Sequence, residues 1–199
     1  IRDRHFIAQR MQAWQAWKQH YSNRSVVVFG STHPGEELII LQALQVFKKN
    51  HPQSLAVVVP RHPERFSEVW GLLNQEVGKG AHLVKWSEWQ PDDKAIDYLL
   101  VDAMGELSSL YAIADVAFVG GSLVPIGGHN VLEPMAFSVP VITGQYTHNQ
   151  HDLLRILLQQ QALLVVHNAC ELAESMDLLL KDKTYKQGLV ERANQTLSL

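Results

Sequence analysis

Short, wholly apolar segments alternate along this chain with segments in which apolar residues recur at helical spacing. A short apolar run bounded by turn residues is typical of a strand covered on both faces, and such strands belong to parallel sheets. The alternation predicts six or seven strands separated by helices, and so an α/β fold with a Rossmann-like, doubly wound parallel sheet. The expected strands are residues 25–29, 55–59, 81–85, 98–101, 116–119, 139–143 and 163–166.

Amphipathic patterns between these strands predict the helices. One lies near the start of the chain, where Ile7, Met11, Trp14 and Trp17 share a face. The others are expected to end near residue 50, to lie between 63 and 77, and to cover 106–114, 131–137, 149–160, 170–180 and 183–194. A length of 199 residues suits one α/β domain over residues 1–199.

Charge and cysteine content exclude several classes of protein. The net charge of -3 gives no broad basic surface for nucleic acid or anionic lipid, so any anion recognition must be local. The single cysteine, Cys170, can form neither an internal disulfide nor a cysteine-based zinc site. His148 and His151 are close in sequence but match no strong zinc pattern, so we expect no metal site.

The polar clusters all follow predicted strands. Because the carboxyl ends of parallel strands meet at one edge of the sheet, these clusters should converge there, where such sheets bind ligands. The clusters are Gly-Ser-Thr-His-Pro-Gly-Glu-Glu (30–37), Val-Pro-Arg-His-Pro-Glu-Arg-Phe (59–66), Val-Asp-Ala-Met-Gly-Glu-Leu (101–107) and Phe-Val-Gly-Gly-Ser-Leu-Val-Pro-Ile-Gly-Gly-His-Asn-Val-Leu-Glu-Pro (118–134).

Two Gly-Gly pairs, 120–121 and 127–128, make the last cluster a candidate anion-binding loop. Glycine exposes backbone amides to a ligand, and Asn130 stands where a helix N-cap would direct first-turn N–H groups toward a phosphate. Glu133 would then accept hydrogen bonds from ribose hydroxyls. The alternative is structural, because Asn-x-x-Glu imitates a capping box in which the two residues bond each other's backbone.

Arg61 lies between Pro60 and Pro63, which restrict the backbone and suit a fixed guanidinium for phosphate. The alternative is a surface ion pair with Glu64. Asp102 can cap a helix that begins near residue 104, and a glycine inside that helix's first turn, at 105, favours close approach of a ligand.

The turn at 30–37 lacks both the Lys-Ser/Thr of a Walker motif and Gly-x-Gly-x-x-Gly. Its structural interpretation is a helix start, with Ser31 or Thr32 near the cap and Glu36 and Glu37 complementing the dipole. Ser31 and Thr32 are also candidates for contact with a substrate.

Taken together and in this order, the four clusters resemble the C-terminal half of 3-deoxy-D-manno-octulosonic acid (Kdo) transferases, and the resemblance covers nearly the whole chain. Members of this family are two-domain GT-B glycosyltransferases that transfer Kdo from CMP-Kdo to the lipid A precursor in lipopolysaccharide biosynthesis. The resemblance implies an inverting, metal-independent enzyme that uses no cofactor. In the family the matching positions surround CMP. The implied nucleotide-binding residues are Pro60, Arg61, Met104, Gly105, Glu106, Asn130, Val131, Leu132 and Glu133.

The same resemblance places the catalytic glutamate, the membrane anchor and most of the acceptor surface in an N-terminal domain outside this sequence. It therefore implies no catalytic residue here, a chain that binds the donor without turnover, and contact with the membrane through that missing domain. The expected location is the cytoplasmic face of the bacterial inner membrane, with this chain itself soluble. No nucleic acid partner is expected.

Two other functions remain open from the residues alone. An NADP-dependent oxidoreductase would use Arg61 for the 2′-phosphate, but the missing Gly-x-Gly-x-x-Gly speaks against it. A non-catalytic nucleotide-binding module would need the same site without any catalytic domain.

Overall fold

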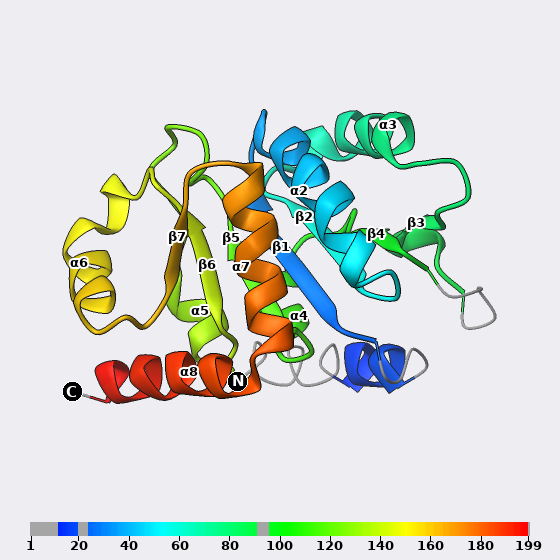
Figure 1. Ribbon diagram of the computed structural model, residues 1–199. Helices are drawn as coiled ribbons and strands as arrows, with labels where there is room; N and C mark the ends of the chain where they lie inside the picture. The colour runs from blue at the N-terminus through cyan, green and yellow to red at the C-terminus, as the bar shows by residue number, and fades with distance from the viewer. Residues whose placement is uncertain (1–11, 20–23, 91–95, 199) are drawn as a thin grey trace.

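Seven parallel strands form one sheet in the computed structural model of the chain, which describes residues 12–19, 24–90 and 96–198 (Figure 1). The strand order is β3-β4-β2-β1-β5-β6-β7. The strands are β1 (Val26–Thr32), β2 (Leu55–Pro60), β3 (Leu83–Lys85), β4 (Tyr98–Leu100), β5 (Val116–Val119), β6 (Val141–Gly144) and β7 (Leu164–Val166). The predicted doubly wound parallel sheet is therefore confirmed.

The chain reverses its direction of winding at β1. From β1 it proceeds through β2 toward β4 and β3, and it then returns to place β5 against the other side of β1. Such a switch point opens a crevice at the carboxyl ends of the two central strands. The register of β1 against β2 shifts between Gly30 and Thr32, and Ser31 between them has φ +56°, so β1 bends where this crevice begins.

The helices and 3-10 turns between the strands follow the expected alternation. They are α2 (Glu36–Asn50), η1 (Pro63–Arg65), α3 (Phe66–Glu76), η2 (Trp86–Glu88), α4 (Leu107–Tyr111), α5 (Leu132–Met135), η3 (His148–Gln150), α6 (His151–Gln159), α7 (Ala169–Lys181) and α8 (Lys183–Leu197). Residues 12–19 are also helical, and the rest of the expected N-terminal helix, with Ile7 and Met11, lies outside the described residues.

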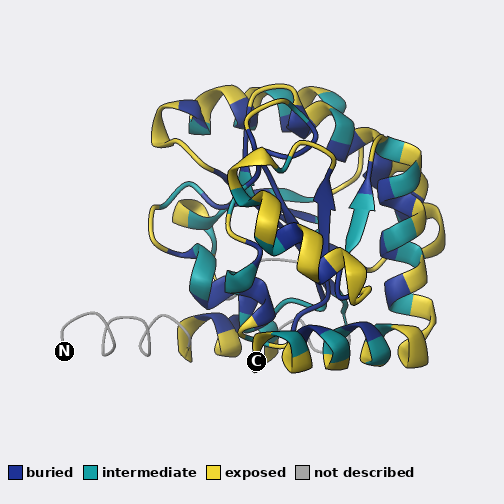
Figure 2. Cartoon of the chain, turned by 90° about the vertical axis from the view of Figure 1, so that its left-hand side faces the viewer, coloured by how far each residue is buried: buried dark blue, intermediate teal, exposed yellow. Residues whose placement is uncertain are grey.

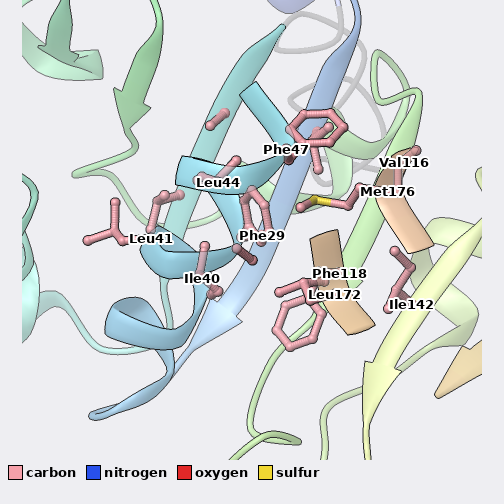
Figure 3. Close-up of a cluster of buried hydrophobic side chains, with 14 of the residues drawn as sticks. Phe29, Ile40, Leu41, Leu44, Phe47, Val116, Phe118, Ile142, Leu172 and Met176 are labelled. Atoms are coloured by element: carbon pink, nitrogen blue, oxygen red, sulfur yellow. The ribbon is translucent and has the colours of Figure 1, made fainter. Parts of the chain in front are cut away.

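One face of the sheet is covered by α2 and α7, which lie side by side in Figure 1. Phe29 and Phe118 on neighbouring strands pack tilted against each other beneath them, with ring centroids 6.1 Å apart. Figure 3 shows how Phe47 and Met176 from the two helices reach toward this cluster. Successive residues of a strand point to opposite faces of the sheet, so the apolar residues next to these in each strand pack on the other face.

The opposite face has two clusters. Trp14 and Trp17 from helix 12–19 pack with α4 and the first strands, and Trp14 stacks on Trp86 at 3.8 Å between ring centroids. A separate cluster joins α5, α6 and α8 to β5 and β6. Figure 2 shows the result: the central strands are buried, the edge strands β3 and β7 are largely intermediate, and the helices alternate buried inner and exposed outer residues.

Several predicted helices differ from the observed ones. α5 is one turn long, and residues 136–138 form turns that end at Ser138 with φ +56°, where the chain reverses into β6. α4 begins at Leu107 and also ends early, whereas α8 extends to Leu197. Among the described residues, no helix combines the length and apolar character that crossing a bilayer requires.

Candidate nucleotide-binding site

A cavity of about 320 Å³ opens at the carboxyl ends of β1, β2, β4 and β5. All four polar clusters of the sequence contribute to it, so their predicted convergence is confirmed. The cavity brings together seven of the nine predicted nucleotide-binding residues, and Val131 and Leu132 do not line it. The lining residues are Ser31, Val59, Pro60, Arg61, Ala103, Met104, Gly105, Glu106, Leu107, Ser108, Tyr111, Val119, His129, Asn130 and Glu133.

Val131 and Leu132 belong to the core instead. The Val131 side chain is buried in the cluster beneath α5, and Leu132 packs against that cluster. The backbone N–H of Val131 faces Oε1 of Gln150 at 3.4 Å, and that of Leu132 donates to Oδ1 of Asn130 at 3.1 Å. The structure thus places both residues behind the cavity, where they fix the turn that carries Asn130 and Glu133.

Arg61 extends from the loop after β2 with an exposed side chain. Its backbone N–H donates to the carbonyl of Thr32 at 3.1 Å, which ties the loops after β1 and β2 together. The alternative ion pair with Glu64 is not formed: Oε1 of Glu64 faces Nδ1 of His62 at 3.8 Å. In the part of the chain that the structure describes, the Arg61 guanidinium has no ion-pair partner, so it is available to an anionic ligand.

The first Gly-Gly pair does not offer its amides to a ligand, so this part of the sequence interpretation was wrong. The Glu36 carboxylate already accepts hydrogen bonds from the backbone N–H groups of Gly121 (2.7 Å), Ser122 (2.9 Å) and Leu123 (2.9 Å), and from that of His33 (3.0 Å). The protein's own side chain occupies the anion nest. The glycine loop is therefore a rigid wall of the site and not its phosphate cradle.

Glu36 is fully buried, and its burial raises the pKa of the carboxyl. The four backbone N–H donors act in the opposite direction by stabilising the charged form. All four of its hydrogen-bond partners are N–H donors, which is the arrangement that an ionised carboxylate requires. Glu36 and Glu37 lie in the first turn of α2, as the helix-start interpretation predicted. The N-cap residue, however, is Gly35 with φ +91°, and not Ser31 or Thr32.

Glu37 holds a second buried ion pair behind the cavity. Its two carboxylate oxygens face the Arg65 guanidinium at 2.7 and 3.2 Å, and Oγ1 of Thr32 donates to Oε1 at 2.8 Å. This bidentate geometry fixes the loop after β1 against η1. Thr32 is buried by these contacts, so of the two hydroxyl candidates only Ser31 lines the cavity.

The second Gly-Gly pair shapes the loop. Gly127 and Gly128 have φ +111° and +79°, which L side chains rarely adopt, and both N–H groups donate to the carbonyl of Gly121. Asn149 and Gln150 of η3 then brace the loop: Nδ2 of Asn149 donates to the carbonyl of Ile126 at 3.2 Å, and Gln150 donates to the carbonyl of His129. Sequence reasoning missed this bracing because its partners lie some twenty residues apart.

Asn130 and Glu133 do not form a capping box among the described residues. Asn130 accepts from Leu132 two residues on, and the helix N-cap is Val131. The dipole of α5 is weaker than the sequence interpretation expected, because a helix of one turn aligns few peptide dipoles. The Glu133 carboxylate is therefore free to face the cavity, where its charge adds to burial in raising the pKa of Tyr111.

The turn between β4 and α4 forms the opposite wall. Gly105 precedes the helix and has φ +78°, so the turn itself requires glycine, and the proposed first-turn position was wrong. Asp102 does not cap a helix: Oδ1 accepts from the backbone N–H of Ser87 at 2.9 Å. The Glu106 carboxylate accepts from Nε1 of Trp14 at 2.9 Å, which ties this wall to the N-terminal helix.

Two histidines meet beside the cavity, a feature that sequence reasoning missed. Nε2 of His33 lies 2.7 Å from Nε2 of His129, although the residues are far apart in the chain. His62 packs edge-on to His33 with ring centroids 5.4 Å apart. The signal available in the sequence was that each histidine follows a strand at the same sheet edge. Among the described residues, no three His, Cys, Asp or Glu side chains are grouped to hold a metal ion.

The switch-point sheet and the cavity at its carboxyl edge define a Rossmann-like half of a GT-B glycosyltransferase. A family model, glycosyl transferases group 1, matches residues 29–196, and the chain belongs to this family. The expected fold class is thereby confirmed. The match also favours a glycosyltransferase over the nicotinamide-dependent oxidoreductase considered from the sequence.

Two curated glycosyltransferases are similar to most of this chain. The chain is 40% identical over 174 residues to 3-deoxy-D-manno-octulosonic acid transferase of Haemophilus influenzae, covering 87% of this chain and 39% of that protein. It is 38% identical over 165 residues to a bifunctional glycosyltransferase/methyltransferase of Fusobacterium nucleatum, covering 81% of this chain and 24% of that protein. The chain thus spans less than half the length of these curated relatives.

A solved structure is similar over its full length. The C-terminal CMP-Kdo binding domain of WaaA from Acinetobacter baumannii superposes with a TM-score of 0.86 at 34% identity, covering 98% of this chain and 99% of that structure. The expected resemblance to the C-terminal half of Kdo transferases is confirmed by these findings.

Proposed function

We propose that this chain binds CMP-Kdo, as the donor-binding half of a glycosyltransferase that transfers Kdo to the lipid A precursor. The observation that carries the proposal is the cavity at the switch point. A guanidinium that has no ion-pair partner among the described residues and a carboxylate line the same space there. The similarity to a CMP-Kdo binding domain supports the choice of donor.

The two charged groups suit different parts of the donor. Arg61 would balance the phosphate charge, and as a fixed cation it would do so without a metal ion. Glu133 would accept hydrogen bonds from the ribose hydroxyls. The positive-φ turn at Gly105, with Met104 before it and Glu106 after it, forms the facing wall, and Pro60 and Asn130 complete the edges.

The chemistry would need a second domain. We assign no catalytic residue to this cavity and take the catalytic base to lie outside this chain. In an inverting displacement the base would come from an N-terminal half, and Arg61 would stabilise the charge that develops on the departing CMP. The acceptor surface and the contact with the inner membrane would belong to that half.

A ligand titration tests the proposal. The 199-residue chain is titrated with CMP, UMP, UDP and NADP while backbone amide NMR signals are followed. We expect CMP to bind with preference and to shift the signals of residues 60–61, 104–106 and 130–133. Preference for NADP, or shifts confined to another part of the chain, would overturn the proposal. Measurable Kdo transfer to a lipid A precursor by this chain alone would contradict the division of labour.

A further inference from the structure

His33 and His129 form a hydrogen-bonded pair between the loops after β1 and β5. Their Nε2 atoms are 2.7 Å apart, their ring planes differ by 13°, and their ring centroids are 5.0 Å apart. The centroid separation equals the nitrogen–nitrogen distance plus the two ring radii, so the rings lie edge to edge with the nitrogens pointing at each other. One proton must lie between them, with one ring donating and the other accepting.

The same buried carboxylate holds both histidines in place. Glu36 accepts from the backbone N–H of His33, and it also accepts from Gly121 and the next two residues of the loop that leads to His129. The backbone N–H of His129 donates to the carbonyl of Gly120 at 3.1 Å. This buried network fixes the backbone that carries each ring, so the two loops hold the histidines close to each other.

The second nitrogen of His129 is the one available to a ligand. Its Cδ2 and Nε2 edge faces Gly121, where an added Cβ would meet those atoms at 2.9 and 3.2 Å, and Nδ1 lies on the other side of the ring. The ring lines the cavity together with Arg61. Within the described residues, Nδ1 of His129 has no hydrogen-bond partner.

The surroundings keep His129 neutral at physiological pH. Burial, followed by the charges of His33, Arg61 and His62, lowers the pKa of His129 to about 4. Burial also lowers the pKa of His33, with His62, Arg65 and Arg61 acting in the same direction and Glu37 against it. A neutral imidazole carries one N–H, so the position of that proton decides whether Nδ1 attracts or repels an anion.

We propose that His33 is a positioning residue. Its Nε2–H donates a hydrogen bond to Nε2 of His129, so the proton of the neutral His129 ring lies on Nδ1. That N–H then donates a hydrogen bond to the phosphate of a nucleoside monophosphate ester beside Arg61. The opposite arrangement would direct the Nδ1 lone pair at the phosphate oxygens. This inference rests on the proposed function, because it takes the anion to be the phosphate of the donor. It adds a second, charge-neutral phosphate contact to that of Arg61.

Paired variants separate a hydrogen-bonding role from a packing role. Glutamine at position 33 can place an N–H close to the former Nε2, whereas methionine has a similar volume and no donor. At neutral pH we expect His33→Gln to bind CMP within about threefold of the parent, and His33→Met to bind it about tenfold more weakly. Cytidine, which has no phosphate, should bind equally to both. Equal CMP affinities for the two variants, or equal losses for CMP and cytidine, would overturn the inference.

A second pair of variants and an NMR measurement test the inference even if the variants at position 33 fail to fold. His129→Asn keeps an N–H near the former Nδ1 and should retain more CMP affinity than His129→Leu, with cytidine again unaffected. In the parent, the side-chain nitrogen-15 spectrum with CMP bound should show Nδ1 of His129 protonated and Nε2 unprotonated. The opposite tautomer would refute the inference.

The preference of the parent chain between CMP and UMP distinguishes a failure of this inference from a failure of the proposed function. A parent that prefers UMP to CMP would refute the cytidine part of the proposed function, and the same ratios between paired variants with UMP would still support the histidine pair. A parent that binds CMP with preference while the paired variants do not differ would leave the proposed function standing and refute the pair.

Discussion

Replacing Glu36 by glutamine should destabilise the chain more than any surface substitution. Oε1 accepts from Ser122 and Leu123, and Oε2 accepts from Gly121 and His33. The amide oxygen of glutamine can keep one of these pairs, but its NH₂ group would face the N–H donors of the other. Two buried backbone N–H groups would lose their acceptor at about 1–3 kcal/mol each, so the free energy of unfolding should fall by about 2–6 kcal/mol.

Urea unfolding followed by circular dichroism measures this change in the 199-residue chain. Glu64→Gln is the matched control, because its side chain is 74% exposed and its only ion-pair contact among the described residues is with His62. The control should change the free energy of unfolding by no more than about 0.5 kcal/mol. A loss below about 1 kcal/mol for Glu36→Gln would show that the amide nest does not depend on the carboxylate, and would refute the account of the loop given above.

Four further outcomes are expected. Arg61→Ala should weaken CMP more than cytidine in a calorimetric titration, because only CMP has a phosphate; equal losses would assign the side chain to the base, ribose or fold. Glu133→Gln should weaken CMP by about 1.5–3 kcal/mol and reduce its preference over 2′-deoxy-CMP, since hydrogen bonds to charged groups have this magnitude; an unchanged preference would rule out ribose contact. Gly30→Ala should destabilise the chain by about 1–3 kcal/mol because its Cβ would collide with a buried tyrosine hydroxyl, whereas Gly71→Ala, in open space within a helix, should stabilise it by about 0.5–1 kcal/mol in the same urea assay. The pKa of His129 is about 4 in the folded chain and about 6.5 unfolded, so the unfolded chain binds the proton first and stability should fall as pH decreases from about 6.5 to 4; His129→Gln should flatten that part of the pH profile, and an unchanged profile would contradict the shift.

Local chemistry explains what sequence reasoning predicted well. The apolar run of β5 identifies a strand covered on both faces, because Val116, Ala117, Phe118 and Val119 leave no polar face for solvent. Arg61 was found because prolines on both sides restrict its backbone. Such features depend on a few consecutive residues, and a parallel sheet then brings every strand's carboxyl end to one edge.

The short helices were predicted less well, for a physical reason. The apolar spacing after Asn130 suits a longer helix, but Val131 and Leu132 are drawn into the core and Ser138 reverses the chain after one turn. Packing against β6 decides that length, and intrinsic helix propensity is too weak to oppose it. Gly105 lines the cavity, but its positive φ and not a position inside the helix explains why glycine stands there.

The sequence by itself determined the alternation of strands and helices and the edge at which polar residues gather, and seven of the nine nucleotide-binding residues that it predicted line the cavity. Only the tertiary structure decided which polar groups bind each other across long separations. The amides of the first Gly-Gly pair were expected to hold a ligand's phosphate, yet Glu36 reaches them from 85 residues away, and His33 meets His129 across 96. A buried donor must be satisfied by whichever acceptor the fold brings near, and local sequence carries no record of that distance.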